Sequence, residues 1–197
     1  LRDFPFVDPA KGQFQVSARI SEAVLDYASG WPRIEAIEAN LMFDRDKIDV
    51  VGRSGTILGA KLANVRAMLP SLLDEQPQLT VEGSAEGPTA VFLDYIRESP
   101  VRRMLGGFTD GMASIGQGKL RLRLDLALQD MARSKVAGEY QFAANSIIVD
   151  ARLPPIERAS GRVGFPESSL SMTDVRAQLF GGELRISGGS KPDTGVL

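Results

Sequence analysis

The chain has 197 residues, of which 43% are apolar and 24% are charged, values that are ordinary for a globular protein. Its 23 Lys and Arg residues against 25 Asp and Glu residues give a formal net charge of −2, which argues against nucleic acid as a partner because phosphate binding needs a basic excess. Histidine and cysteine are both absent, which excludes Ser-His-Asp and Cys-His nucleophiles, zinc sites built on imidazole or thiolate, Fe–S clusters and disulfides.

The chain has no stretch of about 18 apolar residues and no recognisable signal peptide. It begins at Leu1 rather than Met and stops at Leu197. We therefore expect residues 1–197 to be one fragment of a larger protein, whose anchor or targeting signal lies elsewhere. The lack of cysteine suits both the cytosol and a bacterial envelope.

Alternation of apolar and polar residues dominates the chain and predicts strands with one buried face. In the clearest example, residues 119–128, five leucines point to one side and Lys119, Arg121, Arg123 and Asp125 point to the other. The other predicted strands are residues 13–20, 34–43, 47–52, 56–69, 78–82, 135–142, 159–165, 169–179 and 183–187. Turns are expected at residues 44–46, 83, 87–88, 154–155, 166–168 and 181–182. Because no crossover helices separate them, these strands must pair mostly antiparallel.

A segment near residues 88–108 breaks the alternation and predicts two short helices. Pro88 suits the first turn of a helix, apolar residues recur at helical spacing up to Ile96, and Pro100 ends this helix. A second apolar stripe begins at Val101. The fold class is therefore mainly β with a helical insertion, and we expect the helices to cover one mouth or edge of the sheet.

The sequence also echoes itself, since Phe165 follows Phe43 by 122 residues (165 − 43) and further residues match at this offset. The other identities pair Pro32 with Pro154, Ile34 with Ile156, Glu35 with Glu157, Gly59 with Gly181, and Leu62 with Leu184. This register predicts two copies of one meander, at about residues 13–62 and 135–184.

Three acids, Asp44, Asp46 and Asp49, lie close together in a predicted turn. Oxygen ligands at short spacing could bind Ca²⁺, but the spacing and the glycine of an EF-hand are missing. We interpret the cluster as a solvated hairpin turn and predict no metal site and no cofactor.

Other motifs are equally poor in chemistry. The glycines of residues 52–55 and 116–118 lack the context of a nucleophile elbow or a dinucleotide site, and we interpret them as turn glycines. Further carboxylates, without the convergence that glycoside hydrolysis needs, are Glu82, Glu86, Asp94 and Glu98. No catalytic residue and no enzymatic activity is therefore predicted.

Basic residues gather at Arg102 and Arg103 and along the leucine-rich strand at Lys119, Arg121 and Arg123. They could meet phosphate headgroups or an anionic surface. The favoured interpretation is the solvated side of an amphipathic strand.

The apolar side of the predicted sheet is the remaining candidate. One interpretation is the core of a closed sandwich or barrel, and the other is a sheet whose apolar face is open to lipid. Aromatic residues are only 7% of the chain, which is few for a self-sufficient sandwich core. The candidate face consists of Leu41, Phe43, Ile48, Val50, Leu120, Leu122, Leu124, Leu126, Leu128, Phe165, Leu170 and Met172.

Several segments together resemble the YhdP branch of the AsmA-like proteins, over roughly residues 13–190. The segments that carry the resemblance are residues 79–88, 92–101, 116–118 with the leucine-rich strand after them, 138–142, 154–156, 161–165 and 180–182. They consist of glycines, prolines and alternating aliphatic residues, so the resemblance transfers no catalytic residue.

The resemblance implies a long, strongly curved, groove-like sheet in the periplasm of Gram-negative bacteria, in a parent protein anchored in the inner membrane. It implies that the groove binds phospholipid acyl chains and conducts lipids between the inner and outer membranes. The alternative is a structural or assembly module of the envelope with a closed β core. Besides phospholipid, the cut ends of such a fragment allow an edge-to-edge homodimer.

Overall fold

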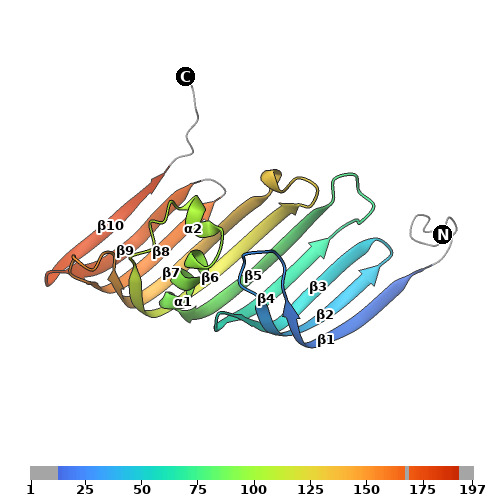
Figure 1. Ribbon diagram of the computed structural model, residues 1–197, viewed down its shortest axis with the longest axis horizontal. Helices are drawn as coiled ribbons and strands as arrows, with labels where there is room; N and C mark the ends of the chain where they lie inside the picture. The colour runs from blue at the N-terminus through green and yellow to red at the C-terminus, as the bar shows by residue number, and fades with distance from the viewer. Residues whose placement is uncertain (1–12, 167–168, 191–197) are drawn as a thin grey trace, which may run out of the picture.

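The computed structural model describes residues 13–166 and 169–190, which form one antiparallel sheet of ten strands with two short helices (Figure 1). The strands are β1 (Gln15–Leu25), β2 (Ile34–Asp44), β3 (Lys47–Ile57), β4 (Ala60–Leu69), β5 (Gln78–Pro88), β6 (Ala113–Ala127), β7 (Lys135–Ile148), β8 (Ile156–Pro166), β9 (Leu170–Leu179) and β10 (Gly182–Ser190). Helices α1 (Thr89–Arg97) and α2 (Val101–Met104) connect β5 to β6, and a 3-10 helix, η2 (Met131–Arg133), connects β6 to β7. The predicted fold class, including the helical insertion near residues 88–108, is confirmed.

The sheet is open. The strands lie side by side in the order of the chain, so β1 pairs with β2 alone and β10 pairs with β9 alone. Figure 1 shows these two edge strands at opposite ends of the molecule. The alternative of a closed β core is therefore wrong for the part of the chain that the structure describes, because the two edges never meet.

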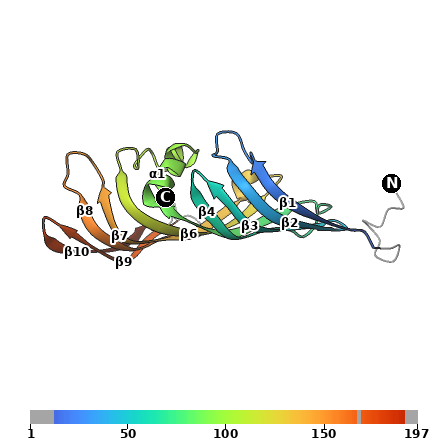
Figure 2. The same ribbon diagram turned by 90° about the horizontal axis from the view of Figure 1, so that it is seen from below.

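The strands bend partway along their length, and the cause lies in their bulges. Six strands contain a non-glycine residue with φ between 50° and 54°, and the strand register shifts beside each of them. An extra residue in one strand of a pair bends that strand and increases its twist. These residues are Glu22, Ala36, Asn64, Ala144, Arg158 and Asp174. In Figure 2 the strand ends rise towards the side of the sheet on which α1 lies, which gives the sheet its curvature.

The predicted strand at residues 56–69 is wrong, because it is divided by a turn. β3 ends at Ile57 and β4 begins at Ala60, and the two residues between them, Leu58 and Gly59, have φ of 49° and 90°. Two consecutive residues with positive φ are typical of the tight turn that fits the twist of a hairpin. The leucine hides this turn in the sequence, since its apolar side chain continues the alternation.

Several glycines that were expected in turns lie inside strands instead. Gly83 and the Gly87–Pro88 pair belong to β5, residues 52–55 to β3, and residues 116–118 to β6. A glycine inside a strand often marks a close approach of a neighbouring group. A Cβ atom on Gly83, for example, would lie 3.1 Å from a methyl carbon of Val65. These positions are explained by cross-strand packing.

Candidate functional site

The strand register collects most apolar side chains on one side of the sheet, which we call the apolar face. Directly paired residues of neighbouring strands share a face. Leu41 pairs with Val50 and Phe43 pairs with Ile48, so these four residues form two adjacent cross-strand pairs. The first row continues from Val50 through Ala67 and Val81 to Leu124 of β6.

The other predicted residues lie on the same face. Leu120, Leu122, Leu124 and Leu126 occupy every second position of β6 and therefore share one face. Leu128 lies one residue beyond the end of this strand. On the C-terminal side, Phe165 pairs with Gly138, the partner of Leu122, and Met172 pairs with Val163. Leu170 is two residues before Met172 in β9 and points to the same side. The structure therefore brings the predicted set together, on strands from β2 to β9.

Much of the apolar face is accessible to solvent. Leu120, Leu122, Leu124 and Leu126 are all half-buried rather than buried. Leu128 and Leu170 are exposed, with 43% and 44% of their surface accessible. Within residues 13–166 and 169–190 no second sheet covers these side chains. A large, contiguous apolar surface of this kind marks a site of interaction with a partner or ligand.

Side chains on this face lie flat, because glycines on adjacent strands make room for them. A Cβ atom on Gly138 would lie 2.5 Å from Cζ of Phe165, and one on Gly118 would overlap the ring of Tyr140. The aromatic rings therefore rest on the backbone of the neighbouring strand. The result is a low apolar floor.

Helix α1 covers one part of the apolar face. The ring of Phe92 contacts the ring of Tyr140 at a centroid distance of 5.1 Å, and the Tyr140 hydroxyl donates a 2.8 Å hydrogen bond to Oγ1 of Thr89. The side-chain amide of Asn145, which is fully buried, also donates to Oγ1 of Thr89. Leu93 of α1 is buried as well. These contacts fix α1 to β7 across the intervening strand.

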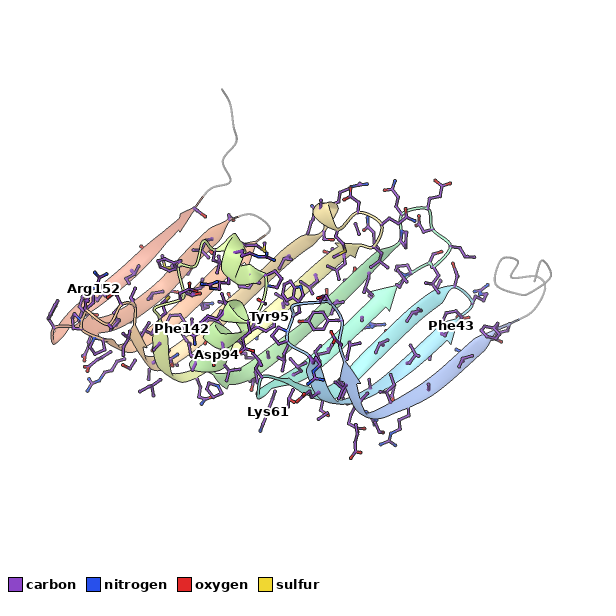
Figure 3. The ribbon with its side chains drawn as sticks, viewed as in Figure 1. Phe43, Lys61, Asp94, Tyr95, Phe142 and Arg152 are labelled. Atoms are coloured by element: carbon purple, nitrogen blue, oxygen red, sulfur yellow. The ribbon has the colours of Figure 1, made fainter. Side chains whose placement is uncertain are left out.

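The apolar face therefore has two parts. The covered strip consists of positions near α1, namely the buried Ala60, Ala85, Gly118 and Phe142 and the half-buried Tyr140. The open strip lies toward the other end of the strands and consists of Phe43, Ile48, Val81, Leu124, Leu126 and Val136. In Figure 3, Asp94 and Tyr95 of α1 lie over the middle of the sheet, whereas Phe43 lies far from the helix.

The opposite side, the polar face, carries Lys119 and Arg123 of β6 in ion pairs, some across strands and one within β6. Lys119 contacts Glu86, and Arg123 contacts Glu82 at 2.5 Å and Asp125 at 3.0 Å. Hydrogen bonds from Arg123, and next from Thr80, lower the pKa of the Asp125 carboxyl, and the hydrogen bond from Lys119 lowers the pKa of Glu86. The solvated-strand interpretation of Lys119 and Arg123 fits these pairings, because their charges are balanced within the sheet.

The two arginines upstream of β6, Arg102 and Arg103, differ in their contacts. Arg102 is bidentate to Asp110, with N–O distances of 2.8 and 2.7 Å, and hydrogen bonding by Arg102 lowers the pKa of that carboxyl. Arg103 and Arg121 are exposed.

The acidic turn does not converge on a common point. Asp49 points to the polar face and accepts two hydrogen bonds from Arg66, at 3.0 and 2.7 Å, which lower its pKa. Asp46 accepts a hydrogen bond from Ser71 in the loop after β4. Within the described ranges, no group of three acidic residues could hold a metal ion. The remaining acids also diverge, since Asp94 pairs with Arg97 on α1 and Glu98 is exposed.

One aromatic cluster near the apolar face is not predicted by the sequence. The connection between β1 and β2 contains Tyr27 and Trp31, whose rings lie 6.1 Å apart, and the ring of Trp31 lies 6.0 Å from that of Tyr95 in α1. The two phenol oxygens, of Tyr27 and Tyr95, are 3.2 Å apart. Helical spacing placed Tyr95 on the helix, but no local pattern shows that a loop 68 residues away contacts it.

No helix in the described portion of the chain has the length and apolar character needed to cross a membrane. The model of the family described as "YhdP protein" matches residues 1–196. The chain is also 24% identical, over 182 residues, to the "Intermembrane phospholipid transporter YhdP" of Escherichia coli (strain K12). The aligned region covers 92% of this chain and 14% of that protein. No solved structure matches the chain.

Proposed function

Because this chain belongs to the YhdP protein family, we propose that it is a segment of a phospholipid-transporting sheet, along whose apolar face acyl chains move between two membranes. The chain spans 14% of the length of its E. coli relative, so it would form only part of the whole path. On this proposal, the lipid-contacting residues are those predicted from the sequence, from Leu41 to Met172.

The observation that carries the proposal is the open apolar face. A sheet that is closed would bury its leucines, whereas this one leaves Leu124 and its neighbours half-buried and Leu128 exposed. The polar face opposite is lined by ion pairs such as Arg66–Asp49, so the two sides of one layer differ sharply in chemistry. This asymmetry suits a layer with lipid on one side and water on the other.

The energetics require no catalytic group. Each CH₂ that leaves an apolar environment for water costs about 0.8 kcal/mol, so an acyl chain of roughly 15 methylenes costs on the order of 12 kcal/mol to expose. A continuous apolar surface removes most of this barrier. With strands about 4.8 Å apart, nine spacings give the ten strands a path of ~43 Å.

We also propose that the chain is not an enzyme and needs no cofactor. We place the chain in the periplasm, within a parent protein that is anchored in the inner membrane by a segment outside this chain. Phospholipid is the proposed ligand, and the free edges of β1 and β10 allow two copies of the fragment to pair edge to edge.

The test is to purify the chain without detergent from a bacterial membrane background and to measure bound phospholipid by native mass spectrometry. The wild-type chain should carry phospholipid. Leu124→Asp should abolish this signal, because it places a charge on the open strip, while circular dichroism remains that of a folded sheet.

The matched control is Val51→Asp. Val51 is exposed, lies on the polar face and pairs with Arg66, so this change adds the same charge without touching the apolar face. Phospholipid should remain bound to this variant. A wild-type chain free of lipid, or equal loss from both variants, would contradict the proposed function.

A further inference from the structure

Helix α1 is held from two sides. On one side, Thr89 and Phe92 contact Tyr140 of β7. On the other, Tyr95 contacts Tyr27 and Trp31 in the connection between β1 and β2. The helix thus joins a loop at the N-terminal edge of the sheet to a strand six places further along. Such a span over an open sheet has no role in strand pairing.

The contacts of Tyr95 are partly buried and specific in geometry. Trp31 and Tyr95 are tilted by 48° at a ring distance of 6.0 Å, an arrangement within the favoured range for aromatic pairs. Burial raises the pKa of the Tyr95 hydroxyl, and its hydrogen bond with Tyr27 raises it further, so the phenol stays neutral at physiological pH. Tyr27 remains 41% exposed, which places this contact at the outer limit of the covered region.

The position of α1 decides which part of the apolar face is accessible. Ala85, Leu120 and Tyr140 are partners in one cross-strand row, and the contact between Phe92 and Tyr140 places α1 over this row. Leu126 and its partner Leu79 lie six residues further along the strands. At about 3.4 Å per residue, the two rows are ~20 Å apart.

We propose that Tyr95 is a positioning residue for the lipid path: held by Tyr27 and Trp31, it fixes α1 across the apolar face as a side wall that confines acyl chains to the open strip. This inference rests on the proposed function and deepens it. It also narrows the proposed set of lipid-contacting residues, because lipid contact becomes uneven along the strands, with Leu126 in the path and Leu120, a member of that set, outside it.

The test uses a photo-crosslinking amino acid at Leu126 or at Leu120, one position at a time. Each protein is incubated with vesicles of phosphatidylethanolamine and phosphatidylglycerol, irradiated, and examined by mass spectrometry for attached lipid. In the wild-type background, lipid should attach at Leu126 and remain at background at Leu120. In Tyr95→Ala, attachment at Leu120 should rise to the level found at Leu126.

Two further variants separate positioning from general stability. Tyr95→Phe keeps the ring that packs on Trp31, so Leu120 should stay at background. In the double variant Tyr27→Cys with Tyr95→Cys, a short bis-maleimide can link only this pair, because the chain has no other cysteine. Leu120 should attach lipid before linking and lose that attachment after it. If Tyr95→Ala does not fold, the cysteine variant before and after linking still tests whether the contact between positions 27 and 95 positions α1.

The outcomes are distinct. Equal attachment at Leu120 and Leu126 in the wild-type background overturns the side-wall inference and leaves the proposed function standing. The same holds if Leu120 stays at background in both Tyr95→Ala and the unlinked cysteine pair. Absence of attachment at Leu126 in every background overturns the proposed function, and the inference with it.

Discussion

At the scale of single residues, the apolar face depends on pairs of one glycine and one large side chain. Gly138 lies beneath the ring of Phe165, and Gly118 lies beneath the ring of Tyr140. Neither glycine is required by a turn. Each is required because the backbone of one strand supports a ring that belongs to the next, and this arrangement keeps the surface low enough for a guest to lie on it.

Gly138→Ala should therefore destabilise the sheet by ~1–3 kcal/mol, the usual cost of forcing extra atoms into a packed site. The new Cβ would lie 2.5 Å from Phe165 and 2.7 Å from the carbonyl oxygen of Arg121, so the ring and the backbone cannot both stay in place. Urea unfolding of the two proteins measures the difference in the free energy of unfolding.

The matched control is Gly188→Ala in β10, where a Cβ would meet nothing within 4 Å. Its free energy of unfolding should stay within about 0.5 kcal/mol of the wild-type value. If both alanines had the same effect, intrinsic strand propensity rather than ring packing would account for the glycine at position 138.

At the scale of the strand, the decisive elements are the bulges. Ala144 in β7 has φ of 54° and sits where the pairing with β8 skips from Phe142 to Asn145. A left-handed conformation costs most L-residues, alanine among them, roughly 1–2 kcal/mol, and glycine avoids this cost. Six strands contain a residue in this conformation, and the bulges that result bend the sheet.

Two adjacent alanines allow this to be measured. Ala143 and Ala144 are both exposed, but only Ala144 has a positive φ. Ala144→Gly should stabilise the chain by up to ~1 kcal/mol, because it relieves the backbone strain. Ala143→Gly should destabilise it by ~0.5–1 kcal/mol, because glycine loses more entropy on folding and Ala143 has no positive φ for glycine to relieve. Thermal unfolding should shift in opposite directions, and shifts of the same sign would show that the bulge is unstrained.

The strands were predictable from the sequence because their signal is local. Alternating leucines identified β6, and its neighbours followed from the same period of two. The sequence does not predict the turn at Leu58 and Gly59, since a leucine in a left-handed conformation has no sequence signature. The glycines of β5 and β6 were assigned to turns because their reason to be glycine lies on another strand, in side chains such as Tyr140 and Val65.

The residues of the candidate site were predictable from the same local alternation, but their division into two strips was not. Parity along each strand was enough to place Leu41, Leu124 and Met172 on one face. It could not show that α1 divides this face into two strips, because that division depends on contacts between Tyr95 and a loop 68 residues away.

At the scale of the whole molecule, the polar face is a network of charges that crosses several strands. Arg66 pairs with Asp49, and Arg123 pairs with Glu82 and Asp125, so acids and bases alternate from β3 to β6. Exposed pairs of this kind contribute little singly, and salt screens them. Their combined effect appears when the carboxylates are protonated.

The free energy of unfolding should fall as the solution is acidified below about pH 4. The hydrogen bonds from Arg66 hold the pKa of Asp49 below its ordinary value of 3.8, and those from Arg123 do the same for Asp125. A carboxyl with a lowered pKa in the folded state stabilises that state above its unfolded pKa, and this contribution is lost as pH falls through the folded pKa.

Urea unfolding between pH 6 and pH 2.5 measures this slope. Asp49→Asn should flatten it, because one carboxyl with a lowered pKa is gone. Arg66→Gln should flatten the slope as well, because it removes the two hydrogen bonds that lower the pKa of Asp49. If Asp49→Asn left the slope unchanged, the Asp49–Arg66 ion pair would not contribute to the pH dependence of stability.

The two halves of the sheet also correspond in their strand boundaries. β8 begins 122 residues after β2 (156 − 34), and β10 begins 122 residues after β4 (182 − 60). The turns after β3 and β9 both place a bulky residue and then a glycine at positive φ, Leu58 with Gly59 and Phe180 with Gly181. We propose on these grounds that the chain contains two copies of one four-stranded meander, with β5, the helices and β6 between them.

The identity of chain order and spatial order has a consequence for how the molecule is made. Each hairpin needs only the one before it as a template, so the sheet can assemble strand by strand as the polypeptide emerges, without waiting for a distant partner. The contact between Tyr27 and Tyr95 is different, because it joins a loop made early to a helix made four strands later. The Tyr27 side of α1 can therefore dock onto hairpins that are already formed, whereas its contacts with Tyr140 form only after β7 has been made.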